Sequence, residues 1–324
     1  MGRRGEFNLI AQLFAPLSDK HQGLGLTDDA ALFVPRAGHT AVLTTDTLVA
    51  GVHFLPDDPP GELARKALRV NLSDLAAMGA TPRGYLLNLA IQDSATDDWI
   101  NGFAAGLAAD QHEFDITLLG GDTVRTPGPG VISITAIGEV RVGRALLRSG
   151  AKVGDDIYVS GTIGDAAAGL RVLTATNKLN PSHAAILIDR YRLPRPRTTL
   201  GPALVGLATA AIDVSDGLIA DLNHICQTSG VSALVGADKV PLSPAIEAAI
   251  ADGLLTKLDA FGGGDDYELL FCAPREARDV LNRLAARLAL PLTAIGEIGP
   301  SSGVQVIDHA GAAIKIDRPG YTHF

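Results

Sequence analysis

Ala41-Val42-Leu43-Thr44-Thr45-Asp46 is the stretch around which this chain is organised, because an apolar run leads directly into three oxygen-bearing side chains. The pattern predicts a buried strand at residues 41–45 that stops on these side chains. Further acidic clusters stand where we expect a strand or a helix to meet a loop: Asp28-Asp29, Asn71-Leu72-Ser73-Asp74, Gly120-Gly121-Asp122 and Asp213-Val214-Ser215-Asp216-Gly217.

The clustered carboxylates indicate a bound cation. Carboxylates directed at one place repel each other and raise one another's pKa, so they stay ionised together only when a positive charge lies among them. Oxygen ligands of this kind suit Mg²⁺, which proteins usually bind through a few carboxylates together with substrate phosphates. The sequence therefore favours a Mg²⁺-dependent enzyme that acts on phosphates.

Length and charge narrow the class of protein. The chain has 324 residues, 47 % of them hydrophobic, with 36 glycines. This length predicts about two domains, and the composition is that of a globular α/β protein. The net charge of −9 argues against binding to nucleic acid or to an anionic membrane, which need a basic surface. It does not argue against phosphate ligands, because a bound metal reverses the local sign of charge.

Cys226 and Cys272 are the only cysteines. They are far apart in sequence, which gives neither a metal-ligand spacing nor a disulfide framework, so we expect reduced thiols in a cytoplasmic protein. Residues 1–7 lack the apolar stretch of a signal peptide, and no apolar run is long enough to span a bilayer.

Hydrophobic periodicity predicts mixed strands and helices in both halves of the chain. In the first half we expect helices at 6–17, at 62–78 and from 97, and strands at 30–34, 41–45, 85–91, 116–119 and 131–137. In the second half we expect helices at 165–173, 200–211, 218–227 and 275–288, and strands at 156–160, 212–214, 231–235, 267–272, 292–295 and 304–307. The fold class is therefore α/β (α+β), with two mixed-sheet domains. A basic, glycine-bearing stretch at 141–154 places the boundary between an N-terminal domain, 1–145, and a C-terminal domain, 146–324.

Several acidic motifs have an ordinary structural explanation beside the functional one. Three glycines before Asp265-Asp266-Tyr267 let a backbone approach a ligand closely, but they also suit a flexible loop with solvated acids. Asp213 and Ser215 fall on one side of a strand end, whereas Asp216 stands where a helix N-cap is expected. Asp122 also suits a turn. Because the clusters all fall at predicted ends of elements, a shared function is favoured over separate structural roles.

Other motifs are weaker or missing. Gly161-Thr162-Ile163-Gly164 resembles a phosphate loop, but the chain has no Walker A lysine, no dinucleotide fingerprint, no zinc motif and no nucleophile elbow. His53 contacts a phosphate or simply stands at a strand edge. The basic side chains at 141–152 include Arg148 and form either a solvated linker or a clamp for a triphosphate.

An ordered series of motifs covers nearly the whole chain. The N-terminal half carries Gly25-Leu26-Thr27-Asp28-Asp29, Leu43-Thr44-Thr45-Asp46, Gly51-Val52-His53-Phe54, Asn71-Leu72-Ser73-Asp74 and Gly120-Gly121-Asp122. The C-terminal half carries Arg148-Ser149-Gly150-Ala151, Gly161-Thr162-Ile163-Gly164-Asp165, Asp213-Val214-Ser215-Asp216-Gly217, Gly263-Gly264-Asp265-Asp266-Tyr267-Glu268-Leu269 and Gly320-Tyr321-Thr322-His323-Phe324. In order and spacing this set resembles the thiamine-monophosphate kinases, a family of the aminoimidazole-ribonucleotide-synthetase-like superfamily.

This resemblance implies two α/β domains that dimerise through N-terminal strands. It implies an enzyme that phosphorylates thiamine monophosphate with ATP to give thiamine diphosphate, directly and with several Mg²⁺ ions. The family's metal ligands correspond to Asp29, Thr44, Thr45, Asp46, Asp74, Asp122, Asp213 and Asp216. Its nucleotide contacts correspond to Gly121, Asp122, Arg148 and Ser215, and its substrate contacts to His53, Asp265 and Tyr321. The family usually has Glu at position 265 and often Trp at position 321.

Two other classes of function are compatible with the acidic motifs. One is another ATP-dependent synthetase of the same superfamily. Selenophosphate synthetases are disfavoured because no cysteine lies near the N-terminal end, and carbamoyl-dehydrating maturation factors because the chain closes on His323-Phe324 without a cysteine. The other is a non-catalytic metal or nucleotide sensor, which would form no ADP when ATP and thiamine monophosphate are supplied together.

Overall fold

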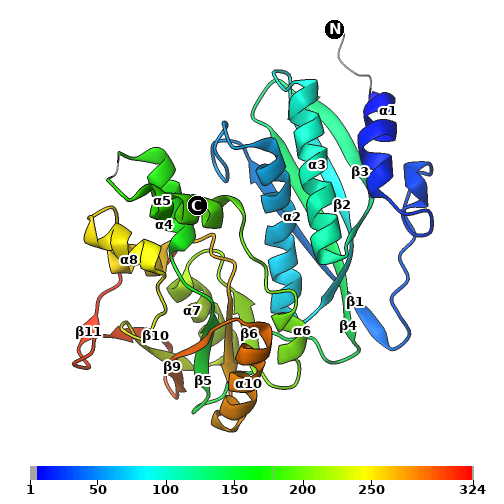
Figure 1. Ribbon diagram of the computed structural model, residues 1–324. Coiled ribbons are helices and arrows are strands. Elements are labelled where there is room, and N and C mark those ends of the chain that lie inside the picture. Colours follow the sequence, from blue (N-terminus) through cyan, green and yellow to red (C-terminus); the bar gives the residue numbers. More distant parts are fainter. Residues whose placement is uncertain (1–5, 177, 323–324) are drawn as a thin grey trace. The chain divides into compact units, whose positions relative to one another are not determined.

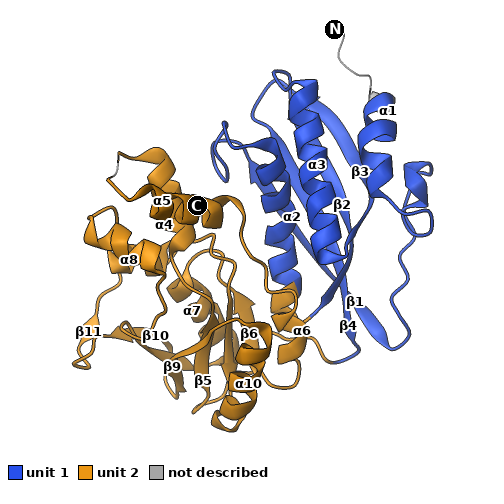
Figure 2. Cartoon of the chain, viewed as in Figure 1, with its two compact units in different colours: residues 1–75, 80–143 blue, residues 76–79, 144–324 orange. Residues whose placement is uncertain are grey.

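The computed structural model describes residues 6–176 and 178–322, so the predicted C-terminal pair His323-Phe324 lies outside the described residues. The chain divides into two compact units (Figure 2). Unit 1 consists of residues 1–75 and 80–143, and unit 2 of residues 76–79 and 144–324. Within the described part of the chain, no helix is both long and apolar enough to cross a membrane.

Unit 1 is a four-stranded sheet with helices on one face (Figure 1). Its strands are β1 (His39–Val49), β2 (Thr81–Gln92), β3 (Thr117–Thr126) and β4 (Val131–Arg141), in the order β1-β4-β2-β3. β4 pairs antiparallel with β1 and β2, and β2 pairs parallel with β3. Helices α2 (Pro60–Ala77) and α3 (Asp97–Phe114) cover the sheet and bury Leu68, Leu72 and Phe103.

Local sequence explains the two helices of unit 1. At α3 the Thr96 side chain accepts a hydrogen bond from the backbone of Trp99, and two aspartates occupy the first turn, as expected at a helix N-terminus. The helices approach closely at Gly61 and Gly106, since a Cβ at Gly106 would overlap the Gly61 carbonyl. This close approach lets α2 and α3 pack side by side on the sheet.

The alternation of side chains along β1 divides them between the two faces of the sheet. Leu48 is buried under the helices, and Thr44 and Asp46 make contacts with α2. Leu43, 65 % exposed, lies on the other face, where the Thr47 hydroxyl donates to Ser133 Oγ. No helix of the described chain covers that outer face at Leu43, which is therefore open to a partner.

Unit 2 is built on a seven-stranded sheet in the order β11-β10-β7-β9-β5-β8-β6. The strands are β5 (Asp156–Ser160), β6 (Ala210–Asp213), β7 (Ser232–Gly236), β8 (Leu269–Ala273), β9 (Leu292–Gly299), β10 (Gly303–Ile307) and β11 (Ala313–Ile314). Only β7 and β10 pair in parallel among the described ladders of this sheet. The helices are α4 (Asp165–Thr174), α5 (Pro181–Arg192), α6 (Leu200–Leu204), α7 (Leu218–Ser229), α8 (Pro244–Ala251), α9 (Lys257–Gly262) and α10 (Arg278–Leu288).

Two hydrophobic cores lie in unit 2. The larger one joins α7 and α8 to one face of the sheet through residues such as Ile157, Leu222 and Ile246. The smaller one joins α10 to the other face, where Tyr158 stacks on Phe271 with ring centroids 5.3 Å apart. The unit is thus a sheet covered by helices on both faces, as the mixed pattern of its sequence predicts.

Two predicted strand ends are wrong. β1 continues to Val49 and β3 to Thr126, so Thr44–Asp46 and Gly120–Asp122 lie inside strands. Both strands continue because a neighbouring strand pairs with them throughout: β4 with β1 and β2 with β3. A polar residue on an exposed face does not end a strand whose backbone hydrogen bonds are satisfied.

Other predicted elements also differ from the structure. Residues 30–34 form no strand in the described chain, and residues 6–17 form α1 (Glu6–Leu9), a π-helical turn (Ile10–Phe14) and a 3₁₀ turn (Ala15–Leu17) in place of one helix. The helix predicted at 200–211 stops at Leu204, and Gly206 follows with φ of +84°. Helices α5, α8 and α9 and strand β11 are additional elements. For α5 and α8 the sequence signal is a helix-starting pair, Asn180-Pro181 and Ser243-Pro244.

Candidate active site

In unit 1, strand β1 and helix α2 bring together the first part of the predicted site. The Thr44 hydroxyl donates to Asp74 Oδ2 at 2.5 Å, and the backbone N–H of Asp46 donates to Asn71 Oδ1 at 3.1 Å. Asn71 and Asp74 are three residues apart on α2 and share the face directed at β1. The side chain of Asn71 is held in turn, because its amide nitrogen donates to the Ala67 carbonyl at 3.1 Å. The 44–46 and 71–74 motifs are therefore in direct contact through these side chains.

Crowding of negative charge dominates the electrostatics of this place. Burial and, to a smaller extent, the neighbouring carboxylate of Asp74 together raise the pKa of Asp46 to about 7. Two carboxylates held this closely share a proton near neutral pH, or share a cation that favours their ionised forms. The site in unit 1 is thus chemically suited to a hard cation.

The remaining acidic candidates of unit 1 lie at its surface. Asp29 is exposed in the loop before β1. Asp122 is exposed on β3, where its Oδ1 accepts from the backbone N–H of Thr123 at 2.9 Å. Thr45 stands on the face of β1 opposite to its neighbours, with its hydroxyl bonded to Thr135 Oγ1 at 3.0 Å. Within unit 1 the structure therefore groups Thr44, Asp46 and Asp74 and leaves the other three outside that group.

Gly121 and His53 are fixed by the backbone. Gly121 has φ of +150°, and a Cβ there would overlap the Leu87 carbonyl on β2. Only glycine therefore allows β2 and β3 to pair at this position. The Nδ1 atom of His53 accepts from the Val49 N–H at 3.1 Å. In the neutral ring the proton is consequently on Nε2, which makes Nε2 the donor nitrogen of this side chain.

In unit 2, a short loop after β6 carries the second acidic motif. Asp213 ends β6 and is 3 % exposed, which confirms the predicted strand end. The loop is held by Asp221, whose Oδ2 accepts the backbone N–H groups of Ser215, Asp216 and Gly217 at 3.0, 3.1 and 3.1 Å. Burial, together with the charge of Asp216, raises the pKa of Asp221 to about 7, while the three N–H donors oppose the shift. Sequence analysis missed Asp221, although an acid in the first turn of a helix that follows a Ser-Asp-Gly loop signals such a clamp.

The glycine-rich segment at 262–264 contacts the protein itself. A Cβ at Gly264 would overlap the Ser215 carbonyl, and a Cβ at Gly262 would overlap the Arg318 carbonyl. These glycines thus allow three pieces of backbone to meet, a packing role that stands beside the predicted approach to a ligand. The segment leads to Asp265, which is half-buried and accepts from the Tyr267 hydroxyl at 3.2 Å.

Two acids beside Asp265 have internal partners. Asp266 is buried and accepts from the Gly164 N–H, at the start of α4, at 2.7 Å. Burial raises the pKa of Asp266 well above its usual value, against the effect of that N–H. Glu268 is fully buried, binds Arg190 at 2.8 Å and Arg197 at 2.6 Å, and accepts from the Ser160 hydroxyl at 2.6 Å. Sequence analysis missed this ion-pair cluster, whose members come from four separate segments.

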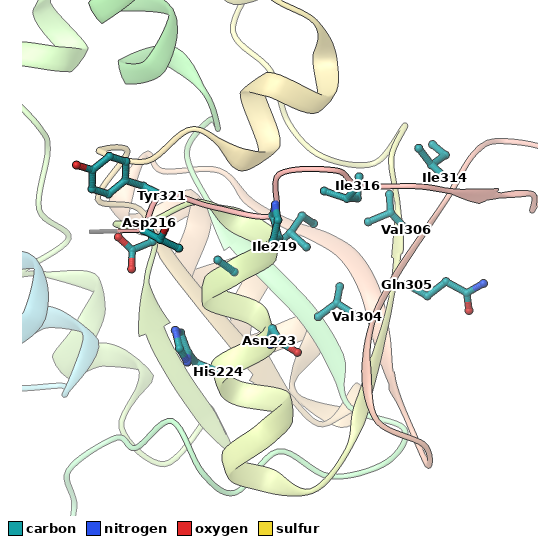
Figure 3. Close-up of a pocket in the computed structure, with 13 residues that line it drawn as sticks. Asp216, Ile219, Asn223, His224, Val304, Gln305, Val306, Ile314, Ile316 and Tyr321 are labelled. Atoms are coloured by element: carbon teal, nitrogen blue, oxygen red, sulfur yellow. The ribbon is translucent and has the colours of Figure 1, made fainter. Parts of the chain in front are cut away.

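Tyr321 lies beside the Asp216 loop. Its backbone N–H donates to the Asp216 carbonyl at 2.9 Å, and its side chain is 50 % exposed. Asp216 and Tyr321 line one end of a cavity of about 670 Å³ between α7, β10 and the C-terminal segment (Figure 3). The apolar wall of this cavity includes Ile219, Val304, Val306, Ile314 and Ile316. The predicted metal ligand and the predicted substrate contact are thus neighbours within unit 2.

The last nucleotide candidate is Arg148, which is exposed and whose carbonyl accepts from Ser229 Oγ at 3.3 Å. Across the described residues, no three His, Cys, Asp or Glu side chains form a group that could hold a metal. The acids occur in pairs: Asp46 with Asp74 in unit 1, and Asp216 with Asp221 in unit 2. Oxygen pairs of this kind fit Mg²⁺, since its usual protein sites supply one or two carboxylates and leave other positions to water and phosphate.

Two family models match the chain. Residues 27–140 match the AIR synthase related protein, N-terminal domain, and residues 152–309 match the AIR synthase related protein, C-terminal domain. The thiamine-monophosphate kinase of Salmonella typhimurium is 44 % identical over 327 residues, a match that covers 99 % of this chain and 98 % of the relative.

Solved structures agree with these matches. The thiamine-monophosphate kinase from Stenotrophomonas maltophilia K279a is 45 % identical with a TM-score of 0.85, and the match covers 96 % of this chain and 98 % of that one. AaThiL complexed with AMPPCP and TMP is 32 % identical with a TM-score of 0.79, and the match covers 100 % and 99 % of the two chains. The resemblance found in the sequence motifs is therefore confirmed, and the chain belongs to the thiamine-monophosphate kinases, within the AIR synthase related family.

Proposed function

We propose that this chain transfers the γ-phosphoryl group of ATP directly to the phosphate of thiamine monophosphate, giving ADP and thiamine diphosphate. The observation that carries this proposal is the Asp46–Asp74 pair, which is held by Thr44 and Asn71 and has a raised pKa at Asp46. A site with this charge is suited to a cation that brings anionic phosphates with it. The complex of AaThiL with an ATP analogue and TMP, at 32 % identity, supports the same pair of substrates.

Several Mg²⁺ ions are part of this proposal. Their proposed ligands are Asp29, Thr44, Thr45, Asp46, Asp74, Asp122, Asp213 and Asp216. When bound, Mg²⁺ neutralises charge on the phosphates and on the carboxylates around them. The protein contributes by holding the oxygen donors in place before the substrates arrive: Asn71 fixes the backbone at Asp46, and Asp221 fixes the backbone at Asp216.

The remaining residues bind and orient the two substrates. For ATP we propose contacts from Gly121, Asp122, Arg148 and Ser215, in which the exposed guanidinium of Arg148 pairs with phosphate oxygens. For thiamine monophosphate we propose His53, whose Nε2–H is suited to a phosphate oxygen, together with Asp265 and Tyr321. The Asp265 carboxylate complements the positive charge of the thiazolium ring, and the Tyr321 ring supplies an aromatic surface.

Direct transfer is favoured because neither cysteine is an activated nucleophile. Both cysteines are buried, and burial raises the pKa of Cys226 to about 11 and that of Cys272 well above its usual value. Their thiols are therefore protonated at neutral pH, which removes the nucleophilic thiolate. The acceptor phosphate is itself ionised near neutral pH, so that it needs orientation and charge neutralisation more than a strong base.

The outer face of β1 supports a homodimer built on N-terminal strands. β1 stands at the edge of its sheet, and Leu43 and Val124 are 65 % and 50 % exposed on strands of this sheet. Exposed aliphatic side chains on a sheet are a common feature of surfaces that associate. We propose that two copies of this chain meet there.

The reaction is tested by measuring ADP with ATP and thiamine monophosphate together and with each alone. We expect ADP only in the complete mixture with Mg²⁺, sequential kinetics, and inversion of configuration at a chiral γ-phosphorus. Excess chelator should abolish turnover. Retention of configuration, or protein labelled by γ-labelled ATP alone, would overturn direct transfer and point to a phosphorylated side chain.

The metal ligands are tested by Asp46→Asn and Asp122→Asn. Each should lower kcat by about 100-fold or more, because an amide binds Mg²⁺ far less well than a carboxylate. The matched control is Asp57→Asn, an exposed loop residue of the same unit, which should keep wild-type kcat. Near-wild-type turnover in either test variant would remove that residue from the proposed ligands.

The raised pKa of Asp46 predicts a pH-dependent stability in metal-free protein. The pKa of Asp46 is about 7 in the folded state, against an ordinary value of 3.8. Between these pH values the folded state binds a proton that the unfolded state has lost, so the free energy of unfolding falls as pH rises from about 4 through 7. Asp46→Asn cannot ionise. At pH 8 with chelator it should therefore be more stable than the parent by about 1–3 kcal/mol, and by less at pH 5, in chemical denaturation. An equal difference at both pH values would contradict the shift.

The dimer is tested by light scattering at micromolar concentration. The wild type should have the mass of two chains, and Leu43→Lys should shift it towards one chain, because the ammonium group loses hydration when the outer face is covered. Val153→Lys replaces an aliphatic residue of similar exposure, 59 %, in unit 2 and should remain dimeric. A monomeric wild type counts against the proposed interface.

A further inference from the structure

We propose that Tyr267 is a positioning residue that orients the Asp265 carboxylate towards the thiamine part of the acceptor substrate. This inference rests on the proposed function and extends it to a side chain that is itself packed inside the protein. Its basis is the hydrogen bond from the Tyr267 hydroxyl to Asp265 Oδ1, 3.2 Å long.

Tyr267 is suited to hold another side chain. It is only 9 % exposed, so its ring is confined by packing, and a tyrosine has just two side-chain torsions before its hydroxyl. Asp265 is half-buried and therefore reaches solvent and ligands. The hydroxyl thus ties an accessible carboxylate to a fixed point in the core.

The backbone around Asp265 is held in an unusual conformation. Asp265 and Tyr267 have φ of +69° and +51°, in the left-handed region that residues other than glycine seldom occupy. Their backbone N–H groups both donate to the loop that follows β6, to Ser215 O and Val214 O, at 2.8 Å each. This arrangement sets both side chains beside the loop that carries Asp216.

Neighbouring acids anchor the segment on either side. Asp266 binds the N–H at the start of α4, and Glu268 binds Arg190, Arg197 and Ser160. Both side chains are buried, with 1 % and 0 % of their surface exposed, and their partners lie inside the protein. Of the acids in the segment from Asp265 to Glu268, Asp265 is therefore the one whose side chain reaches the surface. The hydrogen bond from Tyr267 limits the rotation of that side chain.

Orientation of a binding group reduces the entropy that is lost when a ligand binds. A carboxylate already directed at the acceptor binds it more tightly than one that samples several rotamers. Because Asp265 is proposed to contact the thiamine part and not the reacting phosphates, loss of its orientation should weaken acceptor binding and leave the chemical step unchanged.

The experiment is a double-mutant cycle with Tyr267→Phe and Asp265→Gly. Phenylalanine keeps the ring and removes only the hydroxyl, and glycine tolerates φ of +69° without strain. The control is Tyr158→Phe, which also removes a buried hydroxyl from a carboxylate, 3.4 Å from Asp156 Oδ2 and remote from the Asp265 segment in sequence. Thermal melting of all variants accompanies the kinetics.

For Tyr267→Phe we expect the KM for thiamine monophosphate to rise about 5- to 10-fold, with kcat and the KM for ATP within about twofold. Asp265→Gly should raise the same KM at least as much, and the double variant should be no worse than Asp265→Gly alone, because Tyr267 acts through Asp265. Tyr158→Phe should match the wild type.

The assignment of Tyr267 is overturned if the two changes are additive, if the KM for ATP rises equally, or if Asp265→Gly leaves acceptor binding intact. It is also overturned if Tyr158→Phe has the same effect as Tyr267→Phe, since the loss would then be structural. Turnover of thiamine monophosphate by the wild type is measured first and tests the proposed function separately. If the wild type is active and the effects of the two changes on KM are additive, only the role of Tyr267 is rejected.

Discussion

The burial of Asp46 beside Asp74 is the constraint on which the site of unit 1 depends. A carboxylate at this place loses hydration and faces a second negative charge, and its pKa rises to about 7. Polar groups of β1 and α2 fix the surroundings of this carboxylate: the Thr44 hydroxyl donates to Asp74 Oδ2, and the Asn71 Oδ1 accepts from the backbone N–H of Asp46. In the proposed function a cation would offset the repulsion within this pair, which would couple metal binding to local stability.

Unit 2 also contains a buried carboxylate with fixed polar partners, which here are backbone N–H groups. The Ser215-Asp216-Gly217 loop directs its N–H groups inward, and the buried carboxylate of Asp221 accepts all three. The C-terminal segment satisfies further groups, since the Ala220 N–H donates to the Pro319 carbonyl and the Tyr321 N–H to the Asp216 carbonyl. A segment about a hundred residues away in sequence thereby becomes part of the support for Asp216.

The order of motifs was sufficient to predict the family, and hydrophobic periodicity was sufficient to predict the mixed α/β class and most strands and helices. Their boundaries were less accurate for a physical reason. A strand ends where its hydrogen-bonding partner ends, so the length of β1 was decided by β4 and not by the polar residues Thr44 to Asp46. In the same way, the interval from 200 to 211 has an apolar pattern, but Val205 leaves the helical conformation and Gly206 is left-handed, so the helix stops at Leu204.

The sequence by itself determined which chemical groups this protein has: carboxylates at Asp46, Asp74, Asp213 and Asp216, and no nucleophile in a catalytic motif. These groups depend on residue type and local spacing, which can be read directly from the sequence. Only the tertiary structure decided which groups meet. The clamp from Asp221 to the loop, the ion pairs of Glu268 with Arg190 and Arg197, and the contact of Tyr267 with Asp265 arise from packing and backbone torsions. Such contacts depend on the relative placement of strands and helices, and residue order alone does not specify that placement.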